Sequence, residues 1–511
     1  MSSRTFKALI GFFSDVGGTI ALTTITFIAA PIILELTSQA LYGFWITTIS
    51  ILGYLALTDL GLGMSLTRFV ATLASKEKPK ELNDIISTAF FTFCIIGIVF
   101  FIIGFSISPF IPIWFKIPKE ESLIVLSAYR LAIISGALAL PLSVFGAIVV
   151  GFQQMVVINI SKNIISIISI ILSIILLYGG IGLVALPIAS LFVVIVGSIA
   201  SFIYARKYFP QLKLKISFCN KKDLKKLISF GGYFQLGRVA NTVALSSDNI
   251  VIAGYMGAES VTPYSFTSKL PIMFSVTLAS KLPNAIFPAM TEMFANNEMD
   301  KLRQTYKRIT FFSVRIAILS GAFLFIANQQ FVSLWVGPQN YGGNLLNFVF
   351  VFWALLDTVY RGTTAIVYAS GDMQKWTIAS SAEAILNIAI SITLVGPLGL
   401  AGVALGTLIS KALTTGFYTP YWVCRKINLP INTLLKKSIG YPIIRSLPSI
   451  GLTFLISLLL PLNLGWFWIL LIGLTLCVTN FFMFEGIALM KLSDEHWKIR
   501  LRKLILMQEE Y

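Results

Sequence analysis

Residues 85–108 read IISTAFFTFCIIGIVFFIIGFSIS and contain no charged side chain. A helix needs about 20 apolar residues to cross the roughly 30 Å hydrocarbon core of a bilayer. This stretch is long enough to do so, and none of its side chains would oppose insertion. It therefore predicts a transmembrane helix.

Segments of the same kind fill the rest of the chain. Hydrophobic residues make up 56% of the 511 residues and charged residues only 12%, whereas a soluble protein carries about 25% charged residues. We predict an all-α polytopic membrane protein with about 14 transmembrane helices. The first apolar run is too long for a cleavable signal peptide, so it is expected to be the first span. The predicted spans are 10–34, 40–67, 85–108, 122–149, 159–179, 182–204, 228–254, 262–288, 310–327, 344–369, 377–395, 398–419, 439–460 and 466–487.

Lysine and arginine are distributed unevenly between the two ends of these spans. With the N-terminus placed in the cytoplasm, 28 of the 39 basic residues fall in inside loops and tails, two (Lys116 and Lys119) fall outside, and nine lie within spans. This positive-inside bias predicts that both termini are cytoplasmic. The net charge of +17 then reflects topology and a surface for anionic membrane lipids, and no nucleic-acid partner is expected.

The cysteine and histidine residues give little indication of a metal or cofactor site. The four cysteines have no metal-ligand spacing, and the single histidine, His496, lies in the C-terminal tail. An intramembrane histidine relay is therefore excluded, and we expect no metal and no cofactor.

An internal duplication organises the chain. Residues 146–155 (GAIVVGFQQM) align with residues 364–373 (TAIVYASGDM), and Gly180 with Val184-Ala185-Leu186 aligns with Gly399 and Val403-Ala404-Leu405, both at an offset of about 218 residues. A repeat of six helices enters the membrane twice in the same direction. We predict two parallel six-helix repeats that form two lobes around a central cleft, plus a C-terminal helix pair. The predicted domains are an N-terminal lobe 1–204, a basic cytoplasmic linker 205–227, a C-terminal lobe 228–419, two additional helices 420–487 and a cytoplasmic amphipathic tail 488–511.

Charges within the spans are the candidates for chemistry, because a charge at the bilayer centre costs about 2.5–3.5 kcal/mol even on lenient scales. Those near span ends are expected to extend their side chains to the membrane surface: Lys162, Arg315, Lys411, Arg445 and Glu485. Two spans carry polar stripes on one face of the predicted helix. The seventh has Arg238, Asn241 and Asp248 on one side, and the tenth has Asp357, Tyr360, Arg361 and Tyr368.

An excess of bases in a cleft suits an anionic substrate, because the arginine fork matches phosphate oxygens and stays protonated. Tyrosines on the same face could stack on sugar rings. The predicted substrate-binding residues are Arg238, Arg361, Asn241, Lys269, Arg130, Tyr360 and Tyr368. The predicted ion-coupling residues are Glu383, Asp357, Asp248 and Asp59, with Glu383 the best lone carboxylate for a proton. The alternative for each stripe is an internal network between helices, and Asp357 and Arg361, four residues apart, could simply pair.

The motifs Tyr42-Gly43, Asp59-Leu60-Gly61-Leu62-Gly63, Gly180–Ala185 and Gly399–Ala404, with the long basic loop between halves, resemble a known family. They are similar to Wzx-type polysaccharide (O-antigen) flippases of the multidrug/oligosaccharidyl-lipid/polysaccharide exporter superfamily. The resemblance implies two lobes that alternate between inward and outward openings in a bacterial plasma (inner) membrane. It also implies a cationic cavity, an undecaprenyl-pyrophosphate-linked oligosaccharide as substrate, and a coupling ion, either proton or sodium.

Three alternatives to this function stay open. A multidrug-cation antiporter of the same superfamily would suit twelve spans and an acidic cavity better. Other lipid-linked cargo, such as a peptidoglycan precursor or a teichoic-acid unit, would need the same fold. A membrane glycan polymerase or ligase would need catalytic groups outside the membrane, but the longest predicted outer loop, 328–343, has no Lys, Arg, Asp, Glu or His. We therefore expect a transporter and not an enzyme.

Overall fold

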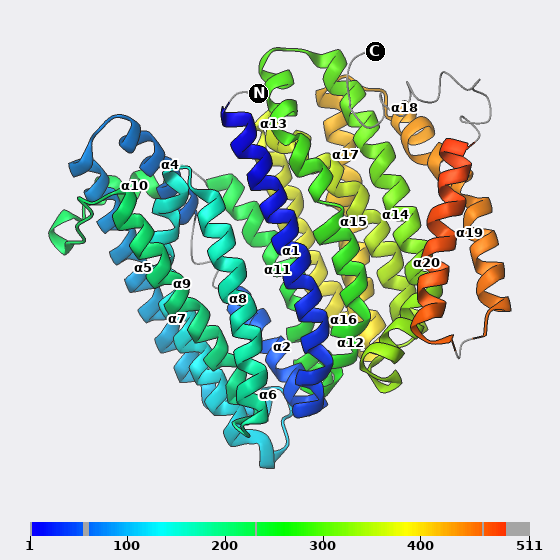
Figure 1. The fold of residues 1–511 in the computed structure, drawn as a ribbon, viewed down its shortest axis with the longest axis horizontal. Coiled ribbons are helices and arrows are strands. Elements are labelled where there is room, and N and C mark those ends of the chain that lie inside the picture. The colour runs from blue at the N-terminus through cyan, green and yellow to red at the C-terminus, as the bar shows by residue number, and fades with distance from the viewer. Residues whose placement is uncertain (1–2, 55–60, 230–231, 462–463, 487–511) are drawn as a thin grey trace. The chain divides into compact units, whose positions relative to one another are not determined.

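The computed structural model describes residues 3–54, 61–229, 232–461 and 464–486, and every regular element in these ranges is helical (Figure 1). The longer α-helices are α1 (Ser3–Leu36), α2 (Gln39–Gly53), α4 (Leu62–Ser75), α5 (Pro79–Ile107), α7 (Ser122–Gly151), α8 (Met155–Tyr178), α9 (Ala185–Tyr208), α10 (Lys221–Ser229), α11 (Gly232–Met256), α12 (Val261–Ile272), α13 (Lys281–Ala295), α14 (Met299–Val336), α15 (Asn344–Ser370), α16 (Met373–Leu413), α17 (Thr415–Lys426), α19 (Tyr441–Leu459) and α20 (Trp466–Phe481). Three π-helical segments are η6 (Met273–Leu278), η8 (Leu434–Gly440) and η10 (Phe482–Gly486).

Ten helical segments in the described ranges are long and apolar enough to cross a bilayer. The protein is thus an all-helical polytopic membrane protein. Of the fourteen predicted spans, 40–67, 228–254 and 262–288 have no counterpart among these ten. The predicted spans 377–395 and 398–419 share one continuous segment, within which a kink at Gly399 separates two helices.

The physical reasons differ from span to span. Helix α2 has only 15 residues, and part of 40–67 lies outside the described residues. Helix α11 carries the polar stripe that lowers its hydropathy. The segment 262–288 is interrupted, because α12 ends at Ile272, a π-helical segment follows, and α13 begins at Lys281.

The chain divides into two compact units. Unit 1 comprises Met1–Phe266 and Asp372–Thr415, and unit 2 comprises Thr267–Gly371 and Gly416–Tyr511. The predicted domains follow the sequence repeat, and their boundaries at 204, 227, 419 and 487 stay a prediction.

In unit 1, α7 packs against α4, α5 and α9, and α11 packs along α16 (Figure 1). Buried leucine, isoleucine and valine side chains fill the first of these groups, among them Leu66, Ile86 and Ile148. Helix α5 is also apolar on its outer side, where Ile95, Ile98 and Ile102 are exposed. A helix that is hydrophobic all round is typical of a membrane span.

In unit 2, α14 packs against α15, α19 and α20 (Figure 1). The contact with α20 is a small apolar cluster of Ala327, Trp468, Ile469 and Ile472. Toward α15 the contact includes a polar bond, because the Tyr306 hydroxyl and the Thr363 hydroxyl lie 3.1 Å apart and are buried.

The basic segment after α9 is anchored to the polar start of α5. Asn83 Nδ2 donates to the Gln211 carbonyl at 3.0 Å, and the Lys213 amide donates to Asn83 Oδ1 at 2.8 Å. Leu212 between them is buried, whereas Lys213 itself is exposed. One asparagine side chain therefore holds the backbone while the lysine side chain stays accessible.

We predict that Asn83→Ala loosens this segment. Each lost hydrogen bond contributes about 0.5–1.5 kcal/mol, so local opening should become roughly tenfold more frequent. Limited trypsin digestion of the purified protein should then cut after Lys213 and Lys215 about tenfold faster. Thr72→Ala, at an exposed position, is the control. Unchanged cleavage in Asn83→Ala would show that the anchor does not hold the segment.

Candidate functional site

A buried carboxylate organises the polar side chains of unit 1. Asp248 on α11 is only 7% exposed. Its Oδ2 atom accepts a hydrogen bond from the Tyr264 hydroxyl at 2.6 Å and another from Thr407 Oγ1 at 2.7 Å. Its Oδ1 atom is buried and has no hydrogen-bond partner in the described part of the chain. One oxygen of this carboxylate is thus left to accept a proton or a cation.

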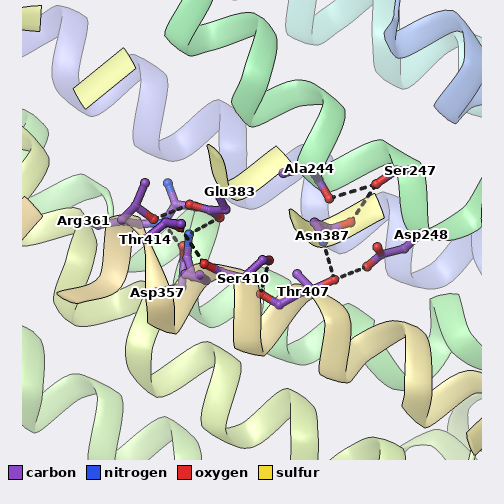
Figure 2. Close-up of polar contacts among 12 residues, drawn as sticks. Ala244, Ser247, Asp248, Asp357, Arg361, Glu383, Asn387, Thr407, Ser410 and Thr414 are labelled. Atoms are coloured by element: carbon purple, nitrogen blue, oxygen red, sulfur yellow. Dashed lines mark hydrogen bonds and ion pairs between the residues drawn. The ribbon is translucent and has the colours of Figure 1, made fainter. Parts of the chain in front are cut away.

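The network continues through an asparagine on α16. Asn387 Nδ2 donates to Thr407 Oγ1 at 2.8 Å, and Asn387 Oδ1 accepts from Ser247 Oγ at 3.0 Å (Figure 2). Asn387 is fully buried. Helices α11, α12 and α16 therefore share one chain of polar contacts, which runs from Tyr264 through Asp248, Thr407 and Asn387 to Ser247.

A turn inside α16 makes this pairing possible. Gly399 has φ 56° and ψ −135°, a backbone conformation that favours glycine. The two helical halves then run back along each other closely, because a Cβ at Gly406 would lie 2.2 Å from Ser391 Oγ. Ser391 Oγ also donates across the turn to the Val403 carbonyl at 3.1 Å. The glycine-rich motif 399–406 is thus what brings Asn387 opposite Thr407.

Further from the turn, the two halves of α16 are joined by an ion pair. Lys411 Nζ lies 3.1 Å from Glu383 Oε1, and the side chains are 3% and 7% exposed. Thr415 Oγ1 donates to the other oxygen of Glu383. The prediction that Glu383 is a lone carboxylate is therefore wrong, and so is the prediction that Lys411 extends to the membrane surface. Helix positions alone could not reveal the pair, because its partners are 28 residues apart and meet through the turn.

The other charged residues predicted near span ends have different surroundings in the structure. Lys162 is exposed, as expected. Arg315 lies 4.0 Å over the Phe484 ring, and Arg445 Nε donates to the Met483 carbonyl at 2.5 Å. Both arginines are half-buried, so they bind within the protein instead of extending away from it. The side chain of Glu485 lies outside the described residues.

Arg238 on α11 stands apart from the buried network of the same unit. It is exposed, and its side chain has no hydrogen bond or ion pair with any residue that the structure describes. Ala240 and Ala244 on the same helix pack against Ala384 of α16. Asn241 is half-buried beside them. The small side chains thus form the helix contact and leave the Arg238 guanidinium accessible.

In unit 2, α15 carries the other predicted arginine. Arg361 Nε lies 2.7 Å from Asp357 Oδ2, with the aspartate almost fully buried and the arginine about one-fifth exposed. The alternative that these two residues pair internally is confirmed. Tyr360 is buried, and Tyr368 is half-buried with its ring edge-on to Phe287. A role for Arg361 in binding stays a prediction.

The remaining predicted residues lie in different surroundings. Lys269 is half-buried on α12, and no hydrogen bond or ion pair joins it to a residue of the described ranges. Arg130 on α7 donates through Nε to Ser108 at 3.0 Å and lies 4.7 Å over the Phe105 ring. Asp59 lies outside the described residues.

Tyr264, Asn387 and Thr407 were not among the site residues predicted from the sequence. A buried asparagine in an otherwise apolar span is a signal that could have identified Asn387, because polar groups in hydrocarbon need a partner. Thr407 could then have been found one helix turn beyond Val403 on the far side of the glycine turn.

A protein-family model matches more than half of the chain. The model described as "Polysaccharide biosynthesis protein" matches residues 11–294. A membrane protein of Bacillus subtilis, EpsK, is 21% identical over 418 residues, which cover 80% of this chain and 82% of EpsK. A putative O-antigen transporter of Shigella flexneri is 23% identical over 380 residues, covering 73% of this chain and 87% of the relative.

Two solved structures share the fold. The lipid II flippase MurJ in an inward closed conformation superposes with a TM-score of 0.67 at 16% identity, over 95% of this chain and all of MurJ. A multidrug resistance MATE family transporter of the MOP superfamily, in its inward-facing conformation, superposes with a TM-score of 0.65 at 16% identity, over 81% of this chain and 96% of the transporter. At these identities the likeness shows a MATE/MurJ-like fold and nothing about substrate.

We predict that Glu383→Ala lowers stability strongly, because it leaves the Lys411 ammonium buried without its partner. Breaking a buried ion pair costs about 3–5 kcal/mol, whereas replacing both partners by uncharged residues can be nearly neutral. The double variant Glu383→Gln/Lys411→Met should therefore regain most of the loss. Thermal unfolding of detergent-purified protein would measure both, with Glu120→Ala, an exposed acid, as control. Equal losses in the single and double variants would contradict a net ion-pair effect.

Proposed function

The chain belongs to the polysaccharide biosynthesis protein family of membrane transporters, and from this we propose that it flips a lipid-linked oligosaccharide across the membrane. The substrate would be an undecaprenyl-pyrophosphate-linked repeat unit, moved from the cytoplasmic to the outer leaflet of the bacterial plasma membrane. The names of distant relatives, an O-antigen transporter and an O-antigen export protein, support this class of cargo. Both termini would be cytoplasmic, as the lysine and arginine bias predicts.

The proposal rests on the surroundings of Arg238. An arginine in the middle of a span must face protein, ligand or water, because hydrocarbon cannot solvate its charge. Here the guanidinium is exposed and has no ion pair with the described residues. A pyrophosphate is a ligand whose charge and oxygen geometry match this fork.

Arg361 contributes less charge than Arg238 in this proposal. Its Nε atom is engaged by Asp357, so the pair is close to neutral. The terminal guanidinium nitrogens of Arg361 would bind phosphate or sugar oxygens, while Asp357 holds the side chain in position. Lys269, Arg130, Asn241, Tyr360 and Tyr368 complete the set that we assign to substrate.

We further propose that transport uses alternating access by two parallel six-helix lobes, 1–204 and 228–419, with 420–487 as an added helix pair. The headgroup would bind between the lobes while its lipid tail stays in the bilayer. The bases screen the pyrophosphate, because an unscreened multiple charge could not enter hydrocarbon. No cofactor is needed for this cycle.

Asp248 is our candidate for the coupling ion. A buried polar atom without a hydrogen bond costs about 1–3 kcal/mol, and Asp248 Oδ1 is in that position. A proton would satisfy this oxygen, and a sodium ion would be bound by it together with the oxygens of Thr407 and Asn387. Glu383 is less suited than Asp248, because Lys411 and Thr415 already engage both of its oxygens.

We predict that Arg238→Ala slows flipping of a lipid-linked oligosaccharide in reconstituted vesicles. Losing a charge-assisted hydrogen bond costs about 1.5–3 kcal/mol, which is roughly a ten- to hundredfold loss. Lys162→Ala, which removes another exposed base from a span, is the matched control and should flip at the wild-type rate. Wild-type flipping by Arg238→Ala would overturn the assignment of this arginine. Selective export of cationic dyes would favour a multidrug antiporter, and polymer formation from the substrate would favour a glycan polymerase.

We predict that Asp248→Asn uncouples transport from its ion gradient. The amide keeps the size of the carboxyl group but cannot take up a proton or balance a sodium charge at pH 7. Flipping rates measured with an imposed sodium gradient or an imposed pH gradient should respond in the wild type to the ion that is coupled. The variant should respond to neither and should still equilibrate substrate slowly. A variant that keeps the full gradient response would exclude Asp248 as the coupling residue.

A further inference from the structure

Unit 2 contains a basic pocket that shares no residue with the candidate sites above. Its volume is about 390 Å³. Helix α14 contributes Gln304, Lys307, Arg308 and Phe311, and the π-helical segment η8 contributes Lys437 and Ser438. We call this the α14–η8 pocket.

No acid in the described ranges pairs with the basic residues of the α14–η8 pocket. Lys307 is half-buried, Arg308 and Lys437 are exposed, and no hydrogen bond or ion pair joins any of the three to a residue that the structure describes. The two acids at the start of α14 are bound elsewhere. Glu298 pairs with Lys301 at 3.0 Å and Asp300 pairs with Arg303 at 2.7 Å. Three cations around one cavity favour an anionic ligand, since their mutual repulsion falls when an anion binds.

The lining of the pocket includes a hydroxyl group. Ser438 is 2% exposed, lines the cavity, and makes no side-chain hydrogen bond within the described ranges. It lies in a π-helical turn, a rare backbone form that occurs often at functional sites. A hydroxyl donor in the same lining as two lysines and an arginine suits the oxygens of a phosphate group.

One wall of the pocket is apolar. The Phe311 ring stacks on Tyr441 at a centroid distance of 6.3 Å and lies edge-on to Phe484 at 6.0 Å. A soluble anion would gain nothing from this aromatic wall. A lipid would, because its chains continue from the phosphate group into apolar surroundings.

The basic residues of the pocket lie next to the predicted cytoplasmic ends of two spans. Lys307 and Arg308 lie three and two residues before the predicted span 310–327, and Lys437 lies two residues before the predicted span 439–460. The lysine and arginine bias assigns both ends to the cytoplasmic face, where anionic lipid headgroups attract basic residues.

We propose that the α14–η8 pocket binds the phosphate of an anionic lipid in the cytoplasmic leaflet. Lys307, Arg308 and Lys437 donate to its oxygens, and the Ser438 hydroxyl donates a further hydrogen bond. A bound lipid would neutralise the three bases and tie α14 to η8. A phospholipid phosphodiester and a polyprenyl pyrophosphate share this chemistry, so the experiment must separate these two sources.

Lipid binding to the full-length protein in detergent can be counted by native mass spectrometry. The lipids are phosphatidylglycerol, a polyprenyl pyrophosphate and zwitterionic phosphatidylcholine as reference. Lys307→Gln/Lys437→Gln should bind the anionic lipids about tenfold more weakly than the wild type, because it loses two charge-assisted contacts. Lys301→Gln, on the same helix and exposed, is the matched control and should bind as the wild type does. Since neither pocket lysine has a partner in the described ranges, the double variant should keep the thermal stability of the lipid-free wild type.

The possible results distinguish a phospholipid from a polyprenyl pyrophosphate, and this pocket from the proposed transport site. Variant-sensitive binding of phosphatidylglycerol identifies a phospholipid site, and variant-sensitive binding of the polyprenyl pyrophosphate alone identifies a second contact for the proposed substrate. Equal binding of phosphatidylcholine, or unchanged binding by the double variant, would overturn the proposal. Arg238→Ala should leave the binding of phosphatidylglycerol unchanged, so the lipid site and the proposed transport function can fail independently.

Discussion

The cost of placing charge in hydrocarbon is the constraint on which the rest of this structure depends. Two internal ion pairs lower this cost. Glu383 and Lys411 neutralise each other inside α16, and Asp357 and Arg361 do so along α15. Arg238 has no such partner among the described residues, which is why its exposed guanidinium, and not the paired Arg361, is the stronger candidate for an anionic substrate.

The turn at Gly399 brings polar and charged residues of α16 together, so that they satisfy one another inside the protein. Without a left-handed residue there, α16 would continue straight and its polar residues would point at lipid or at other helices. With it, Asn387 meets Thr407 and Glu383 meets Lys411 across one hairpin. The tight contact at Gly406 allows the two halves to approach closely enough for these short bonds. The turn therefore positions the carboxylate network as well as the fold.

The sequence predicted the class of fold well because hydropathy and charge bias act locally, one span at a time. It also predicted the Asp357–Arg361 pair as an alternative, since a spacing of four residues needs no tertiary information. It was wrong about Lys411 and about Glu383 being alone, because that pair forms only through the turn in α16. Span 262–288 was predicted as one helix, although a π-helical segment separates α12 from α13 there. Local patterns thus decide helices, whereas contacts made through turns decide which polar residues meet.

The same distinction applies to the basic residues of the loops. Counting them by side predicts topology, and for that purpose Lys213 and Lys307 are equivalent. In the structure they differ, because Lys213 is exposed next to an anchored backbone, while Lys307 lines a cavity with two other bases and a buried hydroxyl. A positive-inside bias needs only charge at the membrane surface. Convergence of three bases on one cavity needs a specific packing of α14 against η8, so the bias alone does not account for it.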